Sequence, residues 1–235
     1  MGMHEALLCI DELIGDQRPS AVFTPNVDHI VNIQCDPDFA EIYAQADLVL
    51  NDSAVLLMTS RLLKKPLQAK VSGSDLFPRL CALAARKGYR VYFLGGKPGI
   101  VDAAAAKLKA IHPELIVAGT YSPSFGFENN AQEGQDILDE IAACRPDILF
   151  VGVGSPKQEK WIAKHKTAMQ VPVALGIGAS FDFVAGSLKR APAWMQHWGL
   201  EWFYRFCCDP KRLFARYFVR DIKFFRIAFR ELFIR

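Results

Sequence analysis

Asp52 is the residue whose place in the sequence best suits it to take a proton from a bound hydroxyl group. It lies in the cluster Asn51-Asp52-Ser53, directly after the apolar run Leu48–Leu50. A carboxylate at the carboxyl end of a buried strand, close to helix N-termini, is suited to general-base catalysis. The same context also suits a helix N-cap, because Asp is favoured there and a helix-like segment follows. The local sequence leaves both roles open.

Two glycine-containing turns indicate phosphate binding. Gly152 and Gly154 precede Ser155-Pro156-Lys157-Gln158, and Gly95-Gly96 precedes Lys97-Pro98-Gly99. Glycine lets the backbone approach a ligand, and the free N–H groups at the start of a helix attract phosphate. Neither turn matches the Walker A or G-x-G-x-x-G pattern, so the sequence does not support an ATP or NAD site. A third cluster, Thr24-Pro25-Asn26, offers a hydroxyl and an amide, although turns use Pro and Asn routinely.

These clusters follow short apolar runs that alternate with helix-like segments. The runs are Ala21–Phe23, Leu48–Leu50, Val91–Leu94, Ile148–Val151 and Val173–Leu175, and Leu115–Gly119 is expected to be a further strand. Helices are expected over residues 36–46, 53–63, 74–87, 132–144 and between Gly99 and His112. The alternation predicts an α/β fold, a Rossmann-like parallel sheet with flanking helices. Ligands of such sheets bind outside the carboxyl ends of the strands, where the clusters would lie.

The C-terminal part of the chain differs in charge from the rest. Beyond Leu188 the sequence has eleven Lys/Arg and four Asp/Glu, a balance of +7, whereas residues 1–188 have a balance of −4. A basic tail on a near-neutral domain favours an anionic surface as partner. We therefore expect an α/β catalytic domain over residues 1–190 and an aromatic, basic helical appendage over residues 191–235. Trp194 and Trp198, four residues apart, are expected in the core.

Residues 211–235 are expected to form one amphipathic helix. At about 100° per residue, Phe214, Phe218, Phe225, Phe229 and Leu232 share one face, opposite a stripe of Lys and Arg. This pattern is typical of a helix in a membrane interface, so an anionic membrane surface is the expected partner. An alternative is a terminal helix that packs its aromatic face on the domain. Nucleic acid is not expected, because the aromatic and basic residues lie on opposite faces of the helix and could not contact a base and its phosphate together.

No cofactor and no metal site are expected. The five histidines are scattered, and the single D-x-D, Asp36-Pro37-Asp38, fits a helix start. No apolar run reaches the roughly 18 residues that span a bilayer. Residues 1–14 lack the pattern of a secretory signal. The six cysteines show no C-x-x-C spacing and are expected to be reduced thiols of a cytosolic protein.

Several motifs occur together in the order found in one family. They are Thr24-Pro25-Asn26 with His29, Ser72-Gly73-Ser74-Asp75-Leu76, Phe93-Leu94-Gly95-Gly96-Lys97-Pro98-Gly99, Gly152-x-Gly154-x-Pro156-Lys157-Gln158-Glu159, Phe181-Asp182-Phe183-x-Ala185-Gly186, Lys189-Arg190-Ala191-Pro192 and Gly199-Leu200-Glu201-Trp202-x-Tyr204-Arg205. On these motifs the chain resembles the WecG/TagA/CpsF family of bacterial glycosyltransferases, from near residue 5 to about residue 218.

The resemblance implies an inverting, metal-independent transfer of a sugar in cell-surface polysaccharide biosynthesis. The donor would be a UDP-sugar, often UDP-N-acetylmannosamine, and the acceptor a sugar linked to polyprenyl diphosphate. Such a protein would be cytoplasmic and peripheral on the inner face of the cell membrane. The sequence leaves self-association into a homo-oligomer open.

The resemblance also carries residue roles. The family's general base aligns with Asp52 and its motif threonine with Thr24. Gln158 and Asp182 match nucleotide-sugar contacts, and the arginines that hold the acceptor diphosphate correspond to some of Arg205, Arg212 and Arg216. The expected substrate-binding set is Asn26, Lys70, Gly95, Gly96, Gly152, Gly154, Lys157, Gln158, Asp182, Arg205, Arg212 and Arg216.

Two departures from the family pattern bear on which sugar is transferred. Asp52 is followed by Ser53 where the family usually has glycine, and Lys70 stands where it usually has arginine. Lysine meets phosphate as a point charge, without the bidentate fork of arginine. The rival interpretation is a membrane-associated nucleotide-sugar-binding or regulatory protein without turnover. The presence of Asp52 favours the enzyme.

Overall fold

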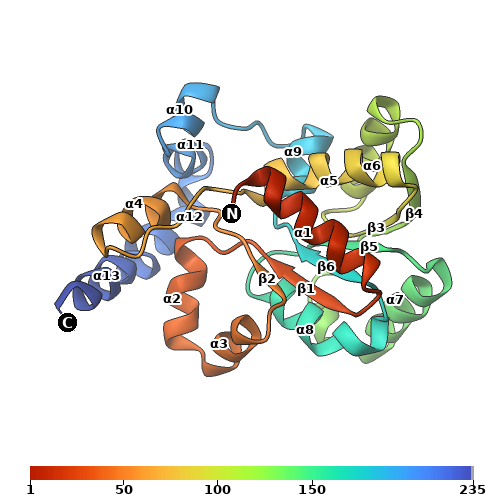
Figure 1. Cartoon of the computed structure of the whole chain (residues 1–235), viewed down its shortest axis with the longest axis horizontal. Coiled ribbons are helices and arrows are strands. Elements are labelled where there is room, and N and C mark those ends of the chain that lie inside the picture. Colours follow the sequence, from red (N-terminus) through yellow and green to blue (C-terminus); the bar gives the residue numbers. More distant parts are fainter. Residues whose placement is uncertain (234–235) are drawn as a thin grey trace.

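Six parallel strands form one sheet in the computed structural model, which describes residues 1–233 apart from the side chains of Ala193, His197 and Arg212. The strands are β1 (Ser20–Phe23), β2 (Leu48–Val49), β3 (Arg90–Gly95), β4 (Ile116–Tyr121), β5 (Ile148–Gly152) and β6 (Val173–Gly176). Their order across the sheet is β2-β1-β6-β5-β3-β4 (Figure 1). The predicted α/β parallel fold is confirmed, and each expected strand is present.

Helices cover both faces of the sheet (Figure 1). One face carries α1 (Met3–Gly15), α5 (Gly73–Lys87), α6 (Ile100–Ile111) and α9 (Ser180–Ala185). The other carries α3 (Pro37–Ala44), α7 (Ala131–Cys144) and α8 (Lys157–Met169), with α2 (Val27–Cys35) beside α3 and the short 3₁₀ turn η1 (Phe127–Asn129) before α7. Alternate strand residues serve the two layers: Phe93 packs in the first core and Tyr92 in the second.

Local capping sets where the helices near the strand ends begin. Asp36 caps α3 and Pro37 is its first residue, as predicted. Ser53 caps α4 (Ala54–Leu62), because its Oγ accepts from the Leu56 N–H at 3.2 Å. The N-cap role left open for Asp52 is therefore wrong. Ser72 caps α5, so this helix begins slightly before the expected Ser74-Asp75 start.

The tail is a series of short helices instead of one long helix. It comprises α10 (Ala193–His197), α11 (Glu201–Cys208), α12 (Pro210–Phe214), the π-helical segment η2 (Ala215–Arg220) and α13 (Lys223–Phe233). The prediction of one helix over residues 211–235 is wrong, since the chain turns at Asp221-Ile222 and the Asp221 N–H bonds the Arg216 carbonyl with the i→i+5 spacing of a π-helix. Ile234 and Arg235 lie outside the described residues.

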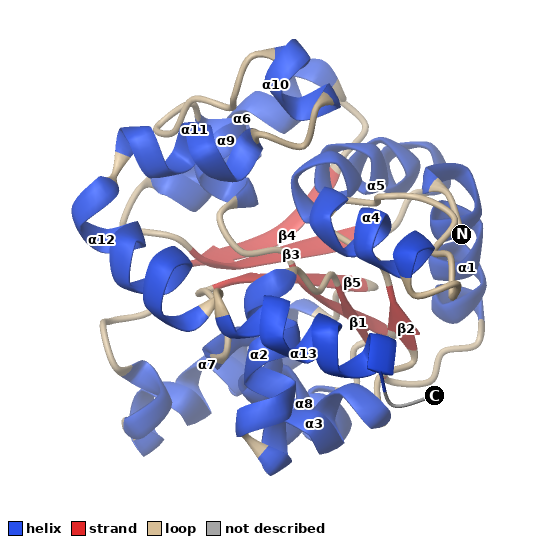
Figure 2. Ribbon diagram, turned by 90° about the vertical axis from the view of Figure 1, so that its left-hand side faces the viewer, coloured by secondary structure: helices blue, strands red, loops and turns tan. Residues whose placement is uncertain are grey.

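A different face of α13 from the one expected packs on the domain. Phe224 is buried against Val31 of α2 and Leu56 of α4, and α13 lies beside α2 (Figure 2). Phe225 and Phe229 of the expected aromatic face are exposed, so the alternative in which this face packs on the domain is wrong. Trp194 and Trp198 are also exposed, against the expectation of a core position. Within residues 1–233, no helix is both long and apolar enough to pass through a membrane.

Candidate active site

A cavity of about 520 Å³ opens between the carboxyl ends of β1, β2 and β6 and the C-terminal helices. Both the sheet domain and the tail contribute to its wall. Eight of the residues expected at the site from the sequence line it: Thr24, Asn26, Asp52, Lys70, Gly154, Gln158, Arg205 and Arg216. Thr24 and Asp52 meet there because they follow the neighbouring strands β1 and β2. Arg205 of α11 and Arg216 of η2 line the cavity from the tail.

Asp52 is placed in the cavity wall by the turn that follows β2. Its backbone N–H donates to the Pro25 carbonyl at 2.9 Å, which joins this turn to the one that follows β1. Burial raises the pKa of the Asp52 carboxyl to about 7; Lys70 and Arg205 oppose this rise, and Glu201 adds to it. A carboxyl that titrates near neutral pH can accept a proton from a bound hydroxyl and release it again.

Thr24 lies at the point where β1, β6 and α5 meet. Its Oγ1 donates to the Gly176 carbonyl at 3.4 Å. At Gly73, the first residue of α5, an added Cβ would lie 3.2 Å from this Oγ1. Glycine there lets the start of α5 approach the end of β1. The positive end of the α5 dipole therefore lies next to both Thr24 and the Asp52 turn, because the Gly73 backbone N–H also bonds the Asp52 carboxylate.

Gln158 is held in a buried polar network beneath the cavity. Its Oε1 accepts from the Gly178 N–H at 3.0 Å, and its Nε2 donates to Glu159 Oε1 at 2.7 Å. The same Glu159 oxygen lies 3.2 Å from His29 Nε2. His29 Nδ1 lies 3.2 Å from the Asn26 backbone N and 3.0 Å from Asn26 Oδ1, so the imidazole joins Asn26 to Glu159. Both ends of the network, Asn26 and Gln158, are thereby fixed at the cavity.

His29 and Glu159 are site residues that sequence reasoning did not single out. Both lie in motifs, but 130 positions separate them, so their spacing carries no signal of contact. Both side chains are buried, and buried charged or polar side chains are normally paired with each other. The sequence signal was confined to the motifs that contain the two residues, and the burial that requires a partner for Glu159 is seen only in the structure.

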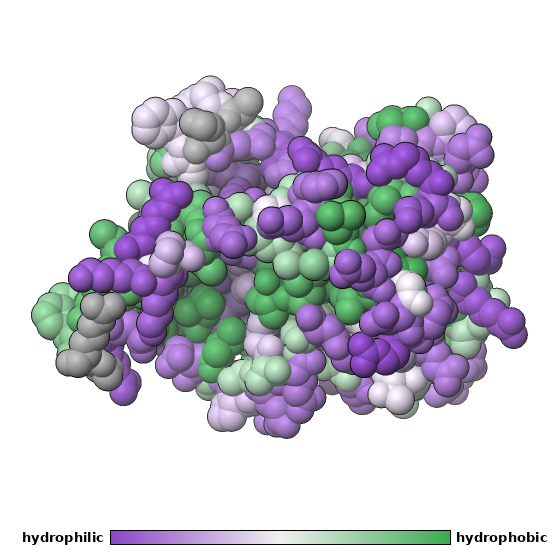
Figure 3. Space-filling view, in the orientation of Figure 1, coloured by the Kyte–Doolittle hydropathy of each residue, from purple (hydrophilic) through white to green (hydrophobic). Residues whose placement is uncertain are grey.

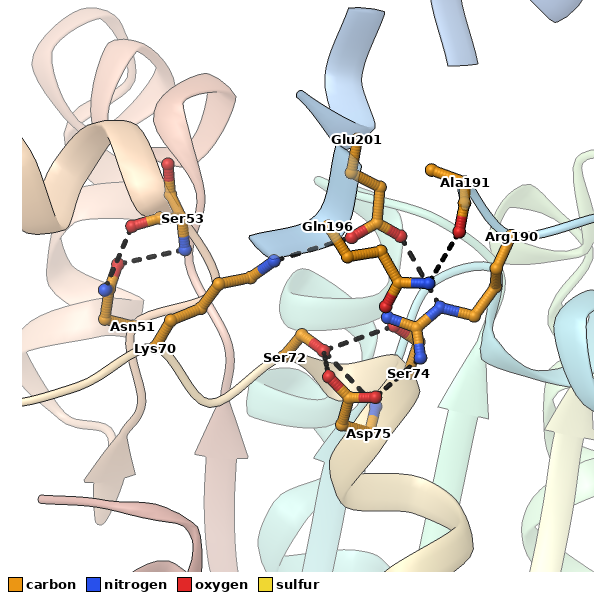
Figure 4. Close-up of polar contacts among 10 residues, drawn as sticks. All are labelled: Asn51, Ser53, Lys70, Ser72, Ser74, Asp75, Arg190, Ala191, Gln196 and Glu201. Carbon is orange, nitrogen blue, oxygen red and sulfur yellow. Dashed lines mark hydrogen bonds and ion pairs between the residues drawn. The ribbon is translucent and has the colours of Figure 1, made fainter. Parts of the chain in front are cut away.

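A second network joins the loop before α5 to α11 (Figure 4). Lys70 Nζ lies 3.4 Å from Glu201 Oε2, and Arg190 Nε lies 3.6 Å from Glu201 Oε1. Arg190 Nη1 also contacts Asp75 Oδ1 at 2.5 Å, and Asp75 accepts from Ser72 Oγ at 2.7 Å. Burial works to raise the pKa of the Asp75 carboxyl, but Arg190 and the Ser72 hydroxyl together hold it below its usual value. Glu201 was not among the expected site residues.

The two described arginines of the expected diphosphate site have different surroundings. Arg205 lies over the Phe183 ring, 5.8 Å from its centroid. Arg216 lines the cavity but pairs with the buried Asp28 of α2, with Nη2 3.1 Å from Oδ2. Arg205 thus has an aromatic neighbour, whereas Arg216 already has a counter-ion from the protein. The Arg212 side chain lies outside the described residues.

Five expected residues are not among those that line the cavity. Gly95 and Gly152 pair across β3 and β5, and a Cβ on Gly95 would lie 2.5 Å from the Gly152 backbone. Their role in the structure is close packing of two strands, and the Gly96 N–H extends it by donating to the Gly152 carbonyl at 3.1 Å. Lys157 pairs with Glu128 and lies over the Phe125 ring. Asp182 accepts from the Ser187 hydroxyl at 3.1 Å.

Among the described residues, three cationic side chains line the cavity together with several acidic ones. Within residues 1–233, no group of three or more His, Cys, Asp or Glu side chains is arranged so that it could hold a metal ion. Lys70, Arg205 and Arg216 supply positive charge to the wall. The wall also carries the carboxylates of Glu201 and Asp221. Asp52 as a proton acceptor, together with the three cations, suits the transfer of a group between a hydroxyl and an anionic leaving group.

A sequence model of the glycosyl transferase WecG/TagA/CpsF family matches residues 1–235. The chain belongs to this family. The resemblance seen in the sequence motifs is thereby confirmed, and so is the expected enzyme class, a glycosyltransferase of cell-surface polysaccharide biosynthesis.

Individual WecG/TagA/CpsF relatives carry one shared name, N-acetylglucosaminyldiphosphoundecaprenol N-acetyl-beta-D-mannosaminyltransferase. The protein from Bacillus subtilis (strain 168) is 33% identical over 198 residues, which cover 84% of this chain and 75% of the relative. The one from Bacillus spizizenii is 34% identical with the same coverage. A Staphylococcus aureus (strain NCTC 8325 / PS 47) protein is 30% identical over 175 residues, 74% of this chain and 66% of the relative. The acceptor in this name is a sugar linked to a polyprenyl diphosphate.

Proposed function

We propose that this glycosyltransferase moves N-acetylmannosamine or a related hexose from a UDP-sugar to a sugar linked to polyprenyl diphosphate. The observation that carries the proposal is Asp52, held at the end of β2 in a cavity whose other charged groups include Lys70 and Arg205. Support for the acceptor comes from the name shared by the Bacillus and Staphylococcus relatives. The combination assigns a base to the acceptor hydroxyl and cations to the donor diphosphate.

The proposed reaction is a single displacement that inverts the anomeric carbon. Asp52 takes the proton of the acceptor hydroxyl while its oxygen forms a bond to the anomeric carbon of the donor sugar. The bond from that carbon to the β-phosphate oxygen breaks, and its electron pair leaves with UDP. One displacement from the face opposite the leaving group inverts the configuration. Thr24, next to Asp52 at the adjacent strand end, is proposed to hold the reacting sugar through its hydroxyl.

Charge that develops on UDP is proposed to be stabilised by the protein without a metal ion. Lys70 and Arg205 line the cavity as cations, and the backbone at Gly154 and Gly178 borders it just before α8 and α9. N–H groups at the start of a helix and basic side chains are both suited to diphosphate. Gln158, fixed by Gly178 and Glu159, keeps one amide N–H for the donor. Substrate binding stays a prediction for five further residues: Gly95, Gly96, Gly152, Lys157 and Asp182.

The tail is proposed to bring the enzyme to the inner face of an anionic membrane, where a lipid-linked acceptor would be found. Phe225 lines the cavity and is exposed, so the cavity leads from Asp52 to an aromatic surface of the tail. Apolar and strongly hydrophilic groups lie side by side over α4 and α13 (Figure 3). That combination suits a membrane interface. On this proposal residues 1–190 are the catalytic domain and residues 191–235 the membrane-association appendage.

Transfer by purified protein tests the proposal. UDP release is measured with a panel of UDP-sugars and a short-chain lipid-diphosphate-N-acetylglucosamine acceptor, for wild type and Asp52→Asn. Because a general base contributes about 10²–10⁴-fold, we expect Asp52→Asn to lose transfer by that order while it still binds UDP. Asp16→Asn removes a carboxylate from an exposed surface pair and is the matched control. Transfer by Asp52→Asn within about threefold of wild type would remove Asp52 from the mechanism.

A further inference from the structure

Glu201 divides its carboxylate between two cations in the wall of the cavity that holds Asp52. One oxygen faces Lys70 Nζ at 3.4 Å and the other faces Arg190 Nε at 3.6 Å (Figure 4). The side chain is only 16% exposed, so solvent screens these contacts weakly. Glu201 belongs to α11, whereas Lys70 belongs to the segment that leads into α5.

Lys70 lies within electrostatic reach of two carboxylates. It favours the charged form of Asp52, while Glu201 acts on Asp52 in the opposite sense. A lysine ammonium is a compact point charge on a flexible stem and can move between neighbouring acids. The contact of Lys70 with Glu201 therefore affects how much of its charge Asp52 experiences.

We propose that Glu201 is a positioning residue that draws the Lys70 ammonium toward α11 and so prevents a close ion pair between Lys70 and Asp52. The inference rests on the proposed role of Asp52 as the base. A carboxylate in a close pair with lysine is a weaker proton acceptor, because the ammonium stabilises its charged form. With Lys70 held by Glu201, Asp52 keeps the proton affinity that general-base catalysis needs near neutral pH.

The surroundings keep Glu201 in place from both sides. Arg190 contacts Asp75 Oδ1 at 2.5 Å, and Gln196 Nε2 donates to the Ala191 carbonyl at 2.6 Å, which fixes the chain between Arg190 and α11. Arg205, one turn further along α11, also favours the charged form of Asp52. The remaining described ionisable groups of this cavity wall are His29 of α2 and, from the tail, Arg216, Tyr217 and Asp221. Of these residues, Glu201 is the carboxylate that contacts Lys70.

The pH dependence of kcat/KM tests the proposal with two variants that shift it in opposite directions. Because the active form of Asp52 is the carboxylate, the wild-type rate is expected to rise with pH and level off above about 7. Glu201→Gln should move this rise to lower pH by roughly one unit and lower the plateau, because Lys70 then pairs with Asp52. Lys70→Met should move the rise to higher pH. Glu201→Asp keeps the charge and should restore most of the wild-type profile.

A thermal comparison gives a readout that does not depend on turnover. The folded-state pKa of Asp52 is raised above its ordinary value of 3.8 to about 7, so its stabilising contribution is present at low pH and is lost as pH rises through about 7. Relative to Asp52→Asn, wild type should therefore become less stable between about pH 4 and pH 7. In the Glu201→Gln background the same loss should be complete at lower pH.

The outcomes separate this inference from the proposed function. The positioning role would be overturned if the stability loss covered the same pH range with and without Glu201. It would also be overturned if Glu201→Gln and Lys70→Met moved the rise in kcat/KM in the same direction. Retained transfer by Asp52→Asn would instead overturn the proposed function, while the thermal comparison still decides the Lys70–Glu201 contact. Glu12→Gln, an exposed carboxylate on α1, is the matched control and should shift neither profile. If Glu201→Gln does not fold, the size of the Lys70→Met shift decides the matter: a lysine held by Glu201 should give an upward shift below about one unit, and a larger shift would show a close Lys70–Asp52 pair and overturn the proposal.

Discussion

The Asp28 carboxylate lies 3.1 Å from the Arg216 guanidinium, so a buried acid of α2 holds the π-helical segment η2 of the tail. Arg220 pairs with the other Asp28 oxygen. Burial and the neighbouring Asp28 raise the pKa of Asp221 to about 6, against the pull of the two arginines. Two acids and two arginines therefore form one cluster between the sheet domain and the tail. An acceptor diphosphate that binds Arg216 would have to share it with Asp28.

Substitution of Arg216 alone is expected to destabilise the fold more than substitution of Asp28 alone. Arg216→Met leaves Arg220 as the one arginine for two acids, Asp28 and Asp221, and Asp28 is only 1% exposed. The change should lower the free energy of unfolding by about 3 kcal/mol. Asp28→Asn should lower it by only about 1 kcal/mol, because the arginines are partly exposed. The double variant should be more stable than the sum of the two losses indicates. Denaturant unfolding measures all three.

The surface pair Arg18–Asp16 provides the control for this cycle. Both of its side chains are exposed, so Arg18→Met and Asp16→Asn should show almost no coupling. Losses at Asp28 and Arg216 that add within about 0.5 kcal/mol would contradict a cluster in which the two residues act together.

Removal of divalent cations should leave transfer unchanged. The cations that face the cavity are lysine and arginine side chains, and they can meet the charge of a leaving diphosphate. Protein treated with excess EDTA and passed through a desalting column should keep transfer within about twofold of the untreated enzyme. Loss of activity that Mg²⁺ or Mn²⁺ restores would show that a metal takes part in the reaction.

Binding to anionic vesicles should depend on the exposed phenylalanines at the end of α13. Phe229 and Phe233 contact each other and are exposed, and neither lines the cavity. Each would contribute roughly 1.5–3 kcal/mol when buried in a bilayer, so the double change to serine should weaken vesicle co-sedimentation by more than tenfold. High salt should weaken binding of wild type only in part, because it screens the basic residues and not the aromatic ones.

Matched changes elsewhere separate this effect from a general loss of apolar surface. Ile111 and Phe125 are exposed to a similar or greater degree but lie on α6 and on the loop after β4. Serine at both should leave vesicle binding unchanged. Deletion of the tail is a poorer experiment, because Phe224 packs on Val31 and Leu56 and its loss would uncover that cluster. Unchanged sedimentation of the Phe229 and Phe233 double variant would place the membrane contact on another surface.

Local sequence was sufficient for the layers of the fold and for the position of Asp52. A buried strand needs a short apolar run, and a polar cluster after it marks the carboxyl end, so both features are written in neighbouring residues. The family motifs added the expectation that Thr24 and Gln158 serve the site. One local ambiguity stayed open: whether Asp52 or Ser53 caps α4 depends on which oxygen reaches the Leu56 N–H, and the structure assigns that bond to Ser53.

The contacts that surround Asp52 were decided only by the tertiary structure. Lys70 and Glu201 are 131 positions apart and His29 and Glu159 are 130 apart, so no periodicity in the sequence relates them. Each pair is brought together by the sheet order, in which β6, late in the sequence, lies directly beside β1, the first strand. The break in the tail is likewise seen only in the tertiary structure. The periodic pattern over residues 211–235 favours one helix, but the structure turns at Asp221-Ile222, between the Arg216–Asp28 ion pair and the burial of Phe224 against α2.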